Sequence, residues 1–198
     1  MAEIDAKTVM KLRAETDAGM MDCKKALTET NGNYDKAKEL LKSKHLAKAD
    51  KVAGKEATVG CIGSFVQGGK YGALVELACN TDFVAANAEF QELLKELAIG
   101  VVAFNPKYAS KDQIPADLVA EERKKYENDV KGKPPQIAEK ILEGKLDKNL
   151  YAVNCLLSMP FPKEDVFKGT YGDLVKAKIA KLGENIVLRR FVRMELGK

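Results

Sequence analysis

The pattern of apolar and polar residues is clearest in the middle of the chain, where it predicts a buried strand followed by a long helix. Residues 73–79 form an apolar run that is typical of a strand in a protein core. The corner after this run contains Asn80, Thr81 and Asp82, three residue types that favour the N-cap of a helix. Phe83 follows at once, and its spacing alone favours a position in the core. Beyond it, apolar residues recur with helical spacing at Phe90, Leu93, Leu94, Leu97, Ala98 and Val101.

Three short helices with a small shared core are predicted at the N-terminus. The first begins after Asp5, where Ile4 and Val9 have the spacing of a hydrophobic staple, and it ends at residues 17–19. A second helix ends at Asn31-Gly32, and a third begins directly afterwards. The third helix is expected to direct three apolar residues inward: Ala37, Leu40 and Leu41.

Three antiparallel strands are predicted for the remainder of the chain. Residues 57–66 and 71–79 favour strand, and the Gln67-Gly68-Gly69-Lys70 segment between them is typical of a hairpin turn. Residues 186–196 alternate, which predicts a third strand with one face covered. The apolar face carries Ile186, Leu188, Val192, Met194 and Leu196, with Arg190 as the one exception. The opposite face carries Arg189, Arg193 and Glu195, and we expect it to be a solvated sheet face.

The segment between the second and third strands is expected to be mostly helical. Pro115 is well placed to begin a helix that runs to about residue 129, and residues 132–135 interrupt it before another short helix. A final helix stops at Gly183, the residue type that favours a helix C-terminus. The predicted fold class is therefore α+β. A three-helix bundle with its connector occupies residues 1–55, and a small three-stranded antiparallel sheet covered by helices occupies residues 56–198.

Composition and charge describe an ordinary globular chain. Of 198 residues, 45% are hydrophobic and 31% are charged, and the formal net charge is only +4. No basic stripe with interleaved aromatic residues is present, so we expect no nucleic-acid binding, and the lysine-rich residues 42–55 favour a solvated connector. No apolar segment is long enough to span a bilayer. Four scattered cysteines predict free thiols in a reducing cytoplasm.

No catalytic or metal-binding constellation is visible in the sequence. His45 is the only histidine, which excludes any mechanism that needs two imidazoles. The glycines fit no nucleotide-binding fingerprint, and no cluster of histidine and carboxylate residues has the spacing of metal ligands. We therefore expect no metal and no cofactor. These absences favour a protein that acts by binding, and not as an enzyme.

Two stretches together resemble the translation elongation factor Ts family. They are residues 12–27, LRAETDAGMMDCKKAL, and residues 77–85, LACNTDFVA. Residues 144–146 and 182–196 also fit, so the similarity covers nearly the whole chain. Two departures are visible: Asp17 stands where the family usually has glycine, and Ala86 stands where a basic residue is common. The chain is similar to compact members that have one core module and lack a long helical insertion.

The resemblance implies a guanine-nucleotide exchange factor for elongation factor Tu. The N-terminal bundle would be UBA-like and would contact the partner through Arg13, Met20 and Met21. From the sequence alone, the two methionines fit a binding surface and a core position equally well. The resemblance also implies that Thr81, Asp82, Phe83 and Val84 contact the partner where Mg²⁺ is displaced, with Phe83 pointing outward. Compact members are expected to form homodimers through their sheets.

Two other functions remain open at this point. The N-terminal bundle could belong to an adaptor that recognises ubiquitin-like folds, with the rest of the chain as a scaffold. The chain could also be an RNA-binding accessory factor of translation, although its modest charge argues against this function.

Overall fold

The computed structural model describes residues 5–198, so the staple predicted between Ile4 and Val9 lies outside the described part of the chain. The order of elements confirms the predicted α+β class. The helices are α1 (Ala6–Thr16), α2 (Met20–Glu29), α3 (Tyr34–Val52), α4 (Asp82–Ala85), α5 (Ala88–Phe104), α6 (Ala116–Lys124), α7 (Pro135–Leu146), α8 (Ala152–Asn154) and α9 (Tyr171–Leu182). The strands are β1 (Val59–Gln67), β2 (Tyr71–Cys79) and β3 (Val187–Glu195). Single helical turns occur at Lys111–Gln113, Glu127–Val130, Asp147–Tyr151 and Leu156–Ser158.

Helices α1, α2 and the first half of α3 form the predicted bundle around a small core of their own. That core contains Val9, Leu12, Ala18, Cys23, Ala26, Leu27, Ala37 and Leu41, with Leu40 half-buried against it. Helix α2 ends before Asn31 and Gly32, as the sequence predicts, and both residues have left-handed backbone in the turn to α3. Asn33 then caps α3, because its side chain accepts a hydrogen bond from the Lys36 amide at 3.0 Å.

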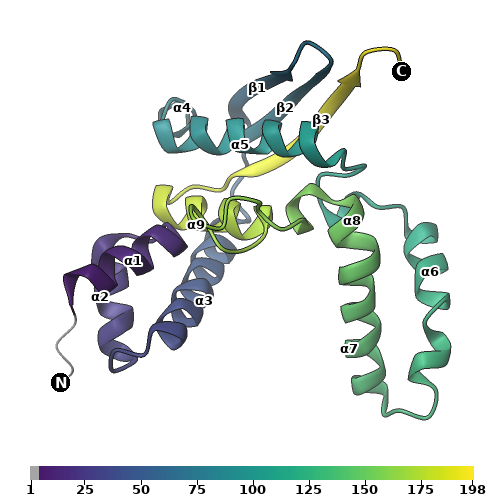
Figure 1. Cartoon of the computed structure of the whole chain (residues 1–198), viewed down its shortest axis with the longest axis horizontal. Helices are drawn as coiled ribbons and strands as arrows, with labels where there is room; N and C mark the ends of the chain where they lie inside the picture. Colours follow the sequence, from purple (N-terminus) through teal and green to yellow (C-terminus); the bar gives the residue numbers. More distant parts are fainter. Residues whose placement is uncertain (1–4) are drawn as a thin grey trace.

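The three strands form one antiparallel sheet in the order β1-β2-β3. Gly68 and Gly69 both have positive φ in the β1–β2 turn, a conformation that suits a tight hairpin. Helix α5 packs along one face of the sheet, and α9 lies beyond it (Figure 1). Val75 and Leu77 of β2 are fully buried against Phe90, Leu97 and other residues of α5. This arrangement places the larger core between the sheet and the helices.

Strand β3 departs from the predicted alternation because it contains a β-bulge. Glu76 pairs with Arg190, whereas the next residue of β2, Leu77, pairs with Leu188, so Arg189 is an extra residue on β3. Beyond the bulge, the residues that the alternation places toward the core face solvent, and those that it places toward solvent face the core. Leu188 is buried as expected, but beyond the bulge Phe191 and Arg193 turn toward the helices. The expectation of one covered apolar face is therefore wrong for the second half of the strand, where Val192, Met194 and Leu196 are 56%, 72% and 76% exposed.

The opposite face of the sheet is open and apolar among the residues that the structure describes. Register places Ile62 and Val66 of β1, Leu74 of β2, and Val192 and Met194 of β3 on this face, and all five are exposed. We call these five residues the open face. Arg190 and Glu76 form an ion pair of 2.6 Å on the same side of the sheet. Figure 1 shows no helix covering this side.

A two-helix hairpin, α6 and α7, projects away from the rest of the molecule (Figure 1). The sequence predicts two helices here but not their projection. Pro115 precedes α6 as its N-cap, and the helix ends at Lys124, before the predicted residue 129. Arg123 and Glu139 form an ion pair between the two helices. None of the described helices is long and apolar enough to cross a membrane.

An ion network joins the bundle to the larger core. Lys178 on α9 is 5% exposed, and its ammonium lies 2.6 Å from Asp17 Oδ2 and also contacts Glu89 on α5. Lys181 contacts the same two carboxylates. Asp17 follows α1 in left-handed backbone with a φ of 53°, so the departure from the family's usual glycine keeps the turn and adds a charge to this network.

Lys178→Met is expected to lower the free energy of unfolding by about 2 kcal/mol, because it removes the buried cation and leaves Asp17 and Glu89 paired with Lys181 alone. Urea denaturation measures this change. Lys140→Met on the exposed side of α7 is the control, and it should change stability by less than about 0.5 kcal/mol. An equal effect of the two substitutions would show that the network contributes no stability.

The Glu89 carboxylate should make the stability of this network sensitive to acid. Burial by itself raises the pKa of Glu89, but hydrogen bonds and charge from Lys178 and Lys181 outweigh it and lower the pKa. The stabilisation is therefore complete above the unfolded-state pKa of about 4.3 and is lost as the pH falls through the lower folded-state pKa. The stability difference between the parent chain and Glu89→Gln should narrow below about pH 4, as measured by urea denaturation at a series of pH values. A constant difference down to pH 3 would contradict this prediction.

Candidate functional site

The corner between β2 and α5 presents an aromatic side chain to solvent. β2 ends at Cys79, the single helical turn α4 follows, and Asn87 then caps α5 by accepting a hydrogen bond from the Glu89 amide at 2.9 Å. Phe83, the second residue of α4, is 84% exposed. The inward position that spacing alone favours is therefore wrong, and the outward position that the family resemblance implies is confirmed. A side chain of this size exposed on a short, fixed turn is a suitable anchor for a protein partner.

The other predicted residues of the corner differ in exposure: Asp82 is exposed, whereas Thr81 and Val84 are half-buried. Asp82 is exposed, and its Oδ1 accepts a hydrogen bond from the Phe83 amide at 3.0 Å. Val84 is half-buried and packs against the larger core. Of the three possible caps, Thr81 is the one used, since its side chain accepts from the Val84 amide. Ala86, the second departure from the family pattern, is exposed beside them.

The backbone of the corner is fixed by side chains from distant parts of the chain. Glu184, just beyond α9, accepts hydrogen bonds from the amides of Asn80 and Thr81 at 3.2 and 3.0 Å. Its second oxygen accepts from the Thr81 hydroxyl at 2.7 Å. At the other end of α4, Gln91 donates to the Ala85 carbonyl at 2.6 Å. The sequence analysis missed Glu184, and its position directly after the helix-ending Gly183 is the only local signal of a special role.

The three predicted residues of the bundle are also on its surface. Met20 and Met21 begin α2 and are 41% and 64% exposed, which decides against a core position for them. Arg13 on α1 is exposed and lines an open hollow of about 650 Å³ between the bundle and the start of α5. Figure 1 shows α4 and the bundle at the same end of the molecule, one above and one below the end of α9. The structure does not bring Phe83 into contact with Arg13, Met20 or Met21, so these residues form two separate exposed surfaces.

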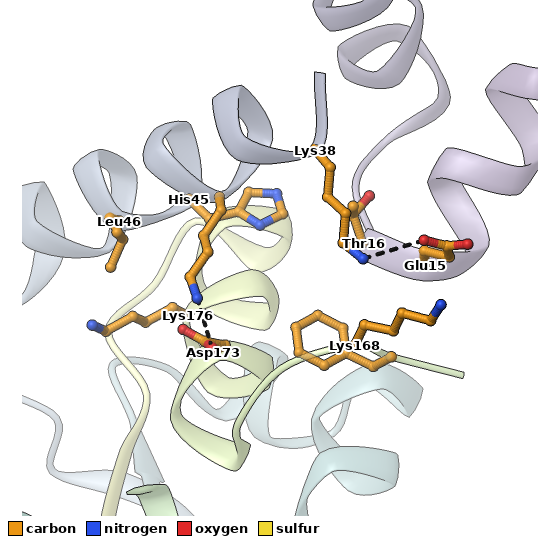
Figure 2. Close-up of a pocket in the computed structure, with 10 residues that line it drawn as sticks. Glu15, Thr16, Lys38, His45, Leu46, Lys168, Asp173 and Lys176 are labelled. Carbon is orange, nitrogen blue, oxygen red and sulfur yellow. Dashed lines mark hydrogen bonds and ion pairs between the residues drawn. The ribbon is translucent and has the colours of Figure 1, made fainter. Parts of the chain in front are cut away.

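A second, smaller cavity of about 50 Å³ lies in the seam between the bundle, α3 and α9 (Figure 2). Lys38 pairs with Glu15 at 3.2 Å and Lys42 pairs with Asp173 at 3.0 Å across this seam. Burial lowers the pKa of His45, the one histidine, and so favours its neutral form. Within residues 5–198, no group of three histidine, cysteine, aspartate or glutamate residues is arranged to hold a metal ion. The charged residues here act as contacts between elements.

Comparison with known proteins shows a consistent similarity. A model of the family "Elongation factor TS" matches residues 5–168. The chain is 46% identical to elongation factor Ts of Thermodesulfovibrio yellowstonii over 98% of this chain and 97% of the relative. It is 46% identical to elongation factor Ts of Fervidobacterium nodosum and 47% identical to that of Coprothermobacter proteolyticus. Each of these two alignments covers 99% of this chain and the whole of the relative.

Proposed function

This chain belongs to the elongation factor Ts family, the nucleotide exchange factors of translation elongation, and from that premise we propose that it promotes GDP release from elongation factor Tu by inserting Phe83 into the partner's nucleotide-binding domain. The observation that carries the proposal is the 84% exposure of Phe83 on a corner whose backbone is held by hydrogen bonds. In this mechanism the phenyl ring enters an apolar slot between two helices of the partner. The resulting shift displaces Mg²⁺ and disturbs the phosphate-binding loop, so GDP loses contacts to both.

The free energies involved are compatible with this mechanism. Exchange is a reciprocal coupling, in which the factor weakens nucleotide binding by the same amount as the nucleotide weakens factor binding. A change in nucleotide affinity from nanomolar to micromolar corresponds to about 4 kcal/mol. One buried aromatic anchor supplies roughly 2–4 kcal/mol. Phe83 therefore needs the help of further contacts.

The N-terminal bundle is the natural source of those contacts. Arg13, Met20 and Met21 are exposed on it, and methionine adapts well to a partner surface. We assign the bundle, residues 1–55, the role of a UBA-like docking unit and residues 56–198 the role of the exchange core. Two separate hydrophobic clusters support two units, although the end of α3 packs in the larger core through Ala49. Neither surface carries out bond-making chemistry, so the chain acts by binding and not as an enzyme.

The open face is the surface we propose for homodimerisation. Five exposed apolar side chains lie side by side on one face of the sheet, and contiguous exposed apolar residues of this kind mark an interaction surface. Arg190 and Glu76 place both charge signs on this face, which suits a two-fold interface in which the same surface meets itself. A second copy of the chain is thus the occupant that fits the open face best.

The direct test of the proposed function is the release of a fluorescent GDP analogue from purified elongation factor Tu. Addition of this protein should raise the release rate many-fold at micromolar concentration. The adaptor alternative makes a different prediction, because an isolated segment of residues 1–55 would then retain the partner in a pull-down while the full chain left the release rate unchanged. A rate that does not respond to the full chain would reject the exchange function.

A further inference from the structure

We propose that Glu184 is a positioning residue for nucleotide exchange, and that its carboxylate holds the corner at residues 80–84 in the conformation that directs Phe83 into solvent. The inference rests on the proposed function, since it concerns how the proposed wedge is held. Glu184 lies 104 residues from Asn80 and 103 from Thr81 along the chain, and it is half-buried beside them. It does not belong to the surface predicted to touch the partner.

The hydrogen bonds of Glu184 meet a specific need of the corner. Strand pairing ends at Cys79, which is opposite Val59, so the amides of Asn80 and Thr81 leave the sheet without a strand partner. Backbone amides that are shielded from water require an acceptor. One oxygen of Glu184 accepts from both amides, at 3.2 and 3.0 Å. An ionised carboxylate is suited to this position because it has acceptor sites only.

The second oxygen of Glu184 extends this control into α4. It accepts a hydrogen bond from the Thr81 hydroxyl at 2.7 Å. That hydroxyl oxygen in turn accepts from the Val84 amide, the N-cap contact of α4. Glu184 therefore sets the orientation of the cap, and the cap sets the direction of the single turn that carries Phe83.

The loop that carries Glu184 is anchored by a contact outside the corner as well as by contacts to the corner itself. Gly183 ends α9 in left-handed backbone, with a φ of 77°. The next residue but one, Asn185, is 7% exposed and donates to the Lys55 carbonyl at 2.9 Å. The backbone amide of Asn185 also donates to the side-chain oxygen of Asn80 at 2.8 Å. The carboxylate thus approaches the corner from a fixed support.

Phe83 depends on this support because its own side chain is largely free of neighbours. At 84% exposure the ring gains little from packing within its own chain, so its direction is set by the backbone of α4. Pre-organisation of such an anchor lowers the entropic cost of binding. Loosening the backbone should therefore weaken exchange even though no partner contact is removed.

Glu184→Gln tests the inference with the side-chain shape retained. The amide oxygen can still accept from the two backbone amides, but the NH₂ group then faces the Thr81 hydroxyl, which must turn from donor to acceptor, and the negative charge that strengthens all three hydrogen bonds is lost. We expect the rate of GDP release to fall about tenfold, as for the loss of a hydrogen bond to a charged group. Glu164→Gln, at an exposed carboxylate, is the matched control and should leave the rate unchanged. Thr81→Val, which removes the hydroxyl relay together with the N-cap of α4, should reduce the rate in the same direction.

Two readouts separate positioning from a general loss of stability. In the Phe83→Ala background, Glu184→Gln should cause no further loss, because the side chain that it positions is already absent. The chain has no tryptophan, so Phe83→Trp introduces a single fluorescent reporter at the corner. Time-resolved anisotropy of that indole in the free protein should show greater local motion when Glu184→Gln is added, measured without urea, where unfolding curves show both variants to be fully folded.

The possible outcomes distinguish the positioning role of Glu184 from the wedge role of Phe83. Full exchange activity of Glu184→Gln, an additive loss in the Phe83→Ala background, or unchanged anisotropy would each overturn the positioning role. If Phe83→Ala itself retained full exchange activity, the wedge would be rejected. The anisotropy measurement needs no partner. Even if the wedge were rejected, it would show whether Glu184 restricts the motion of the corner.

Discussion

Phe83→Ala is expected to fold as the parent chain does and to slow the release of GDP from elongation factor Tu by about 30-fold or more. The estimate follows from the roughly 2–4 kcal/mol that one aromatic anchor contributes at a protein interface. Stability should be preserved because the ring is 84% exposed and its removal leaves no cavity. The measurements are stopped-flow release of a fluorescent GDP analogue and urea unfolding of the free protein.

Val153→Ala is the matched control for this experiment, since it also truncates an exposed apolar residue of a short helix, but far along the chain from the corner. It should alter neither the release rate nor the stability. A marked loss of stability in Phe83→Ala would show that the ring packs within the core, and the wedge would then have no basis. Phe83→Leu should retain part of the activity, because it keeps an apolar side chain at the same position.

The second large effect is expected from Val192→Lys on the open face. Val192 lies on β3 opposite Leu74 of the central strand, so a charge here would lie within the proposed dimer interface. The two-fold axis of a homodimer doubles the substitution, and two like charges buried in an apolar interface cost several kcal/mol. We expect sedimentation equilibrium to change from the mass of two chains to the mass of one.

Val153→Lys serves as the control for solubility and charge, because Val153 is 60% exposed and Val192 is 56% exposed. It should leave the mass of the assembly unchanged. A parent chain that sediments as a monomer at micromolar concentration would remove the homodimer proposal. That result would leave the exchange function untouched, since Phe83 does not belong to the open face.

Sequence patterns were reliable where a single element determines the outcome. The three N-terminal helices, the Gly68-Gly69 hairpin and the helix ending at Gly183 all follow from local conformational preferences, and the structure confirms each of them. The strand and long helix on either side of the corner were equally predictable from their spacing. These features depend on interactions between residues that are close together in sequence.

The exposure of Phe83 and the faces of β3 could not be read from spacing. A period-two pattern assumes an unbroken strand, and the extra residue at Arg189 reverses the two sides beyond it. The single irregularity in the sequence, Arg190 among apolar residues, was the visible trace of this bulge. For Phe83, local pattern favoured the core, and only the similarity of residues 77–85 to a known family pointed outward.

The contacts that hold the candidate site are long-range, and this explains why sequence analysis did not find them. Glu184 reaches Thr81 across 103 residues, and no local pattern specifies that pairing. The charge of Asp17 is visible in the sequence, but its partners Lys178 and Lys181 are identifiable only once α9 is packed against the bundle. Similarity to a known motif was enough to identify the exposed residues of the candidate site. The residues that support them could be identified only from the three-dimensional structure.

Helix α3 has a consequence for the dimensions of any partner. Its 19 residues begin in the bundle, where Ala37 and Leu41 are buried, and end in the larger core, where Ala49 is buried. At 1.5 Å per residue this continuous rod is about 28 Å long. The helix therefore fixes the distance between the bundle and the larger core. A GTPase that binds both ends of this protein must have two binding surfaces at a matching spacing. If α3 were one turn longer, the two ends of this protein would be too far apart to bind both surfaces at once.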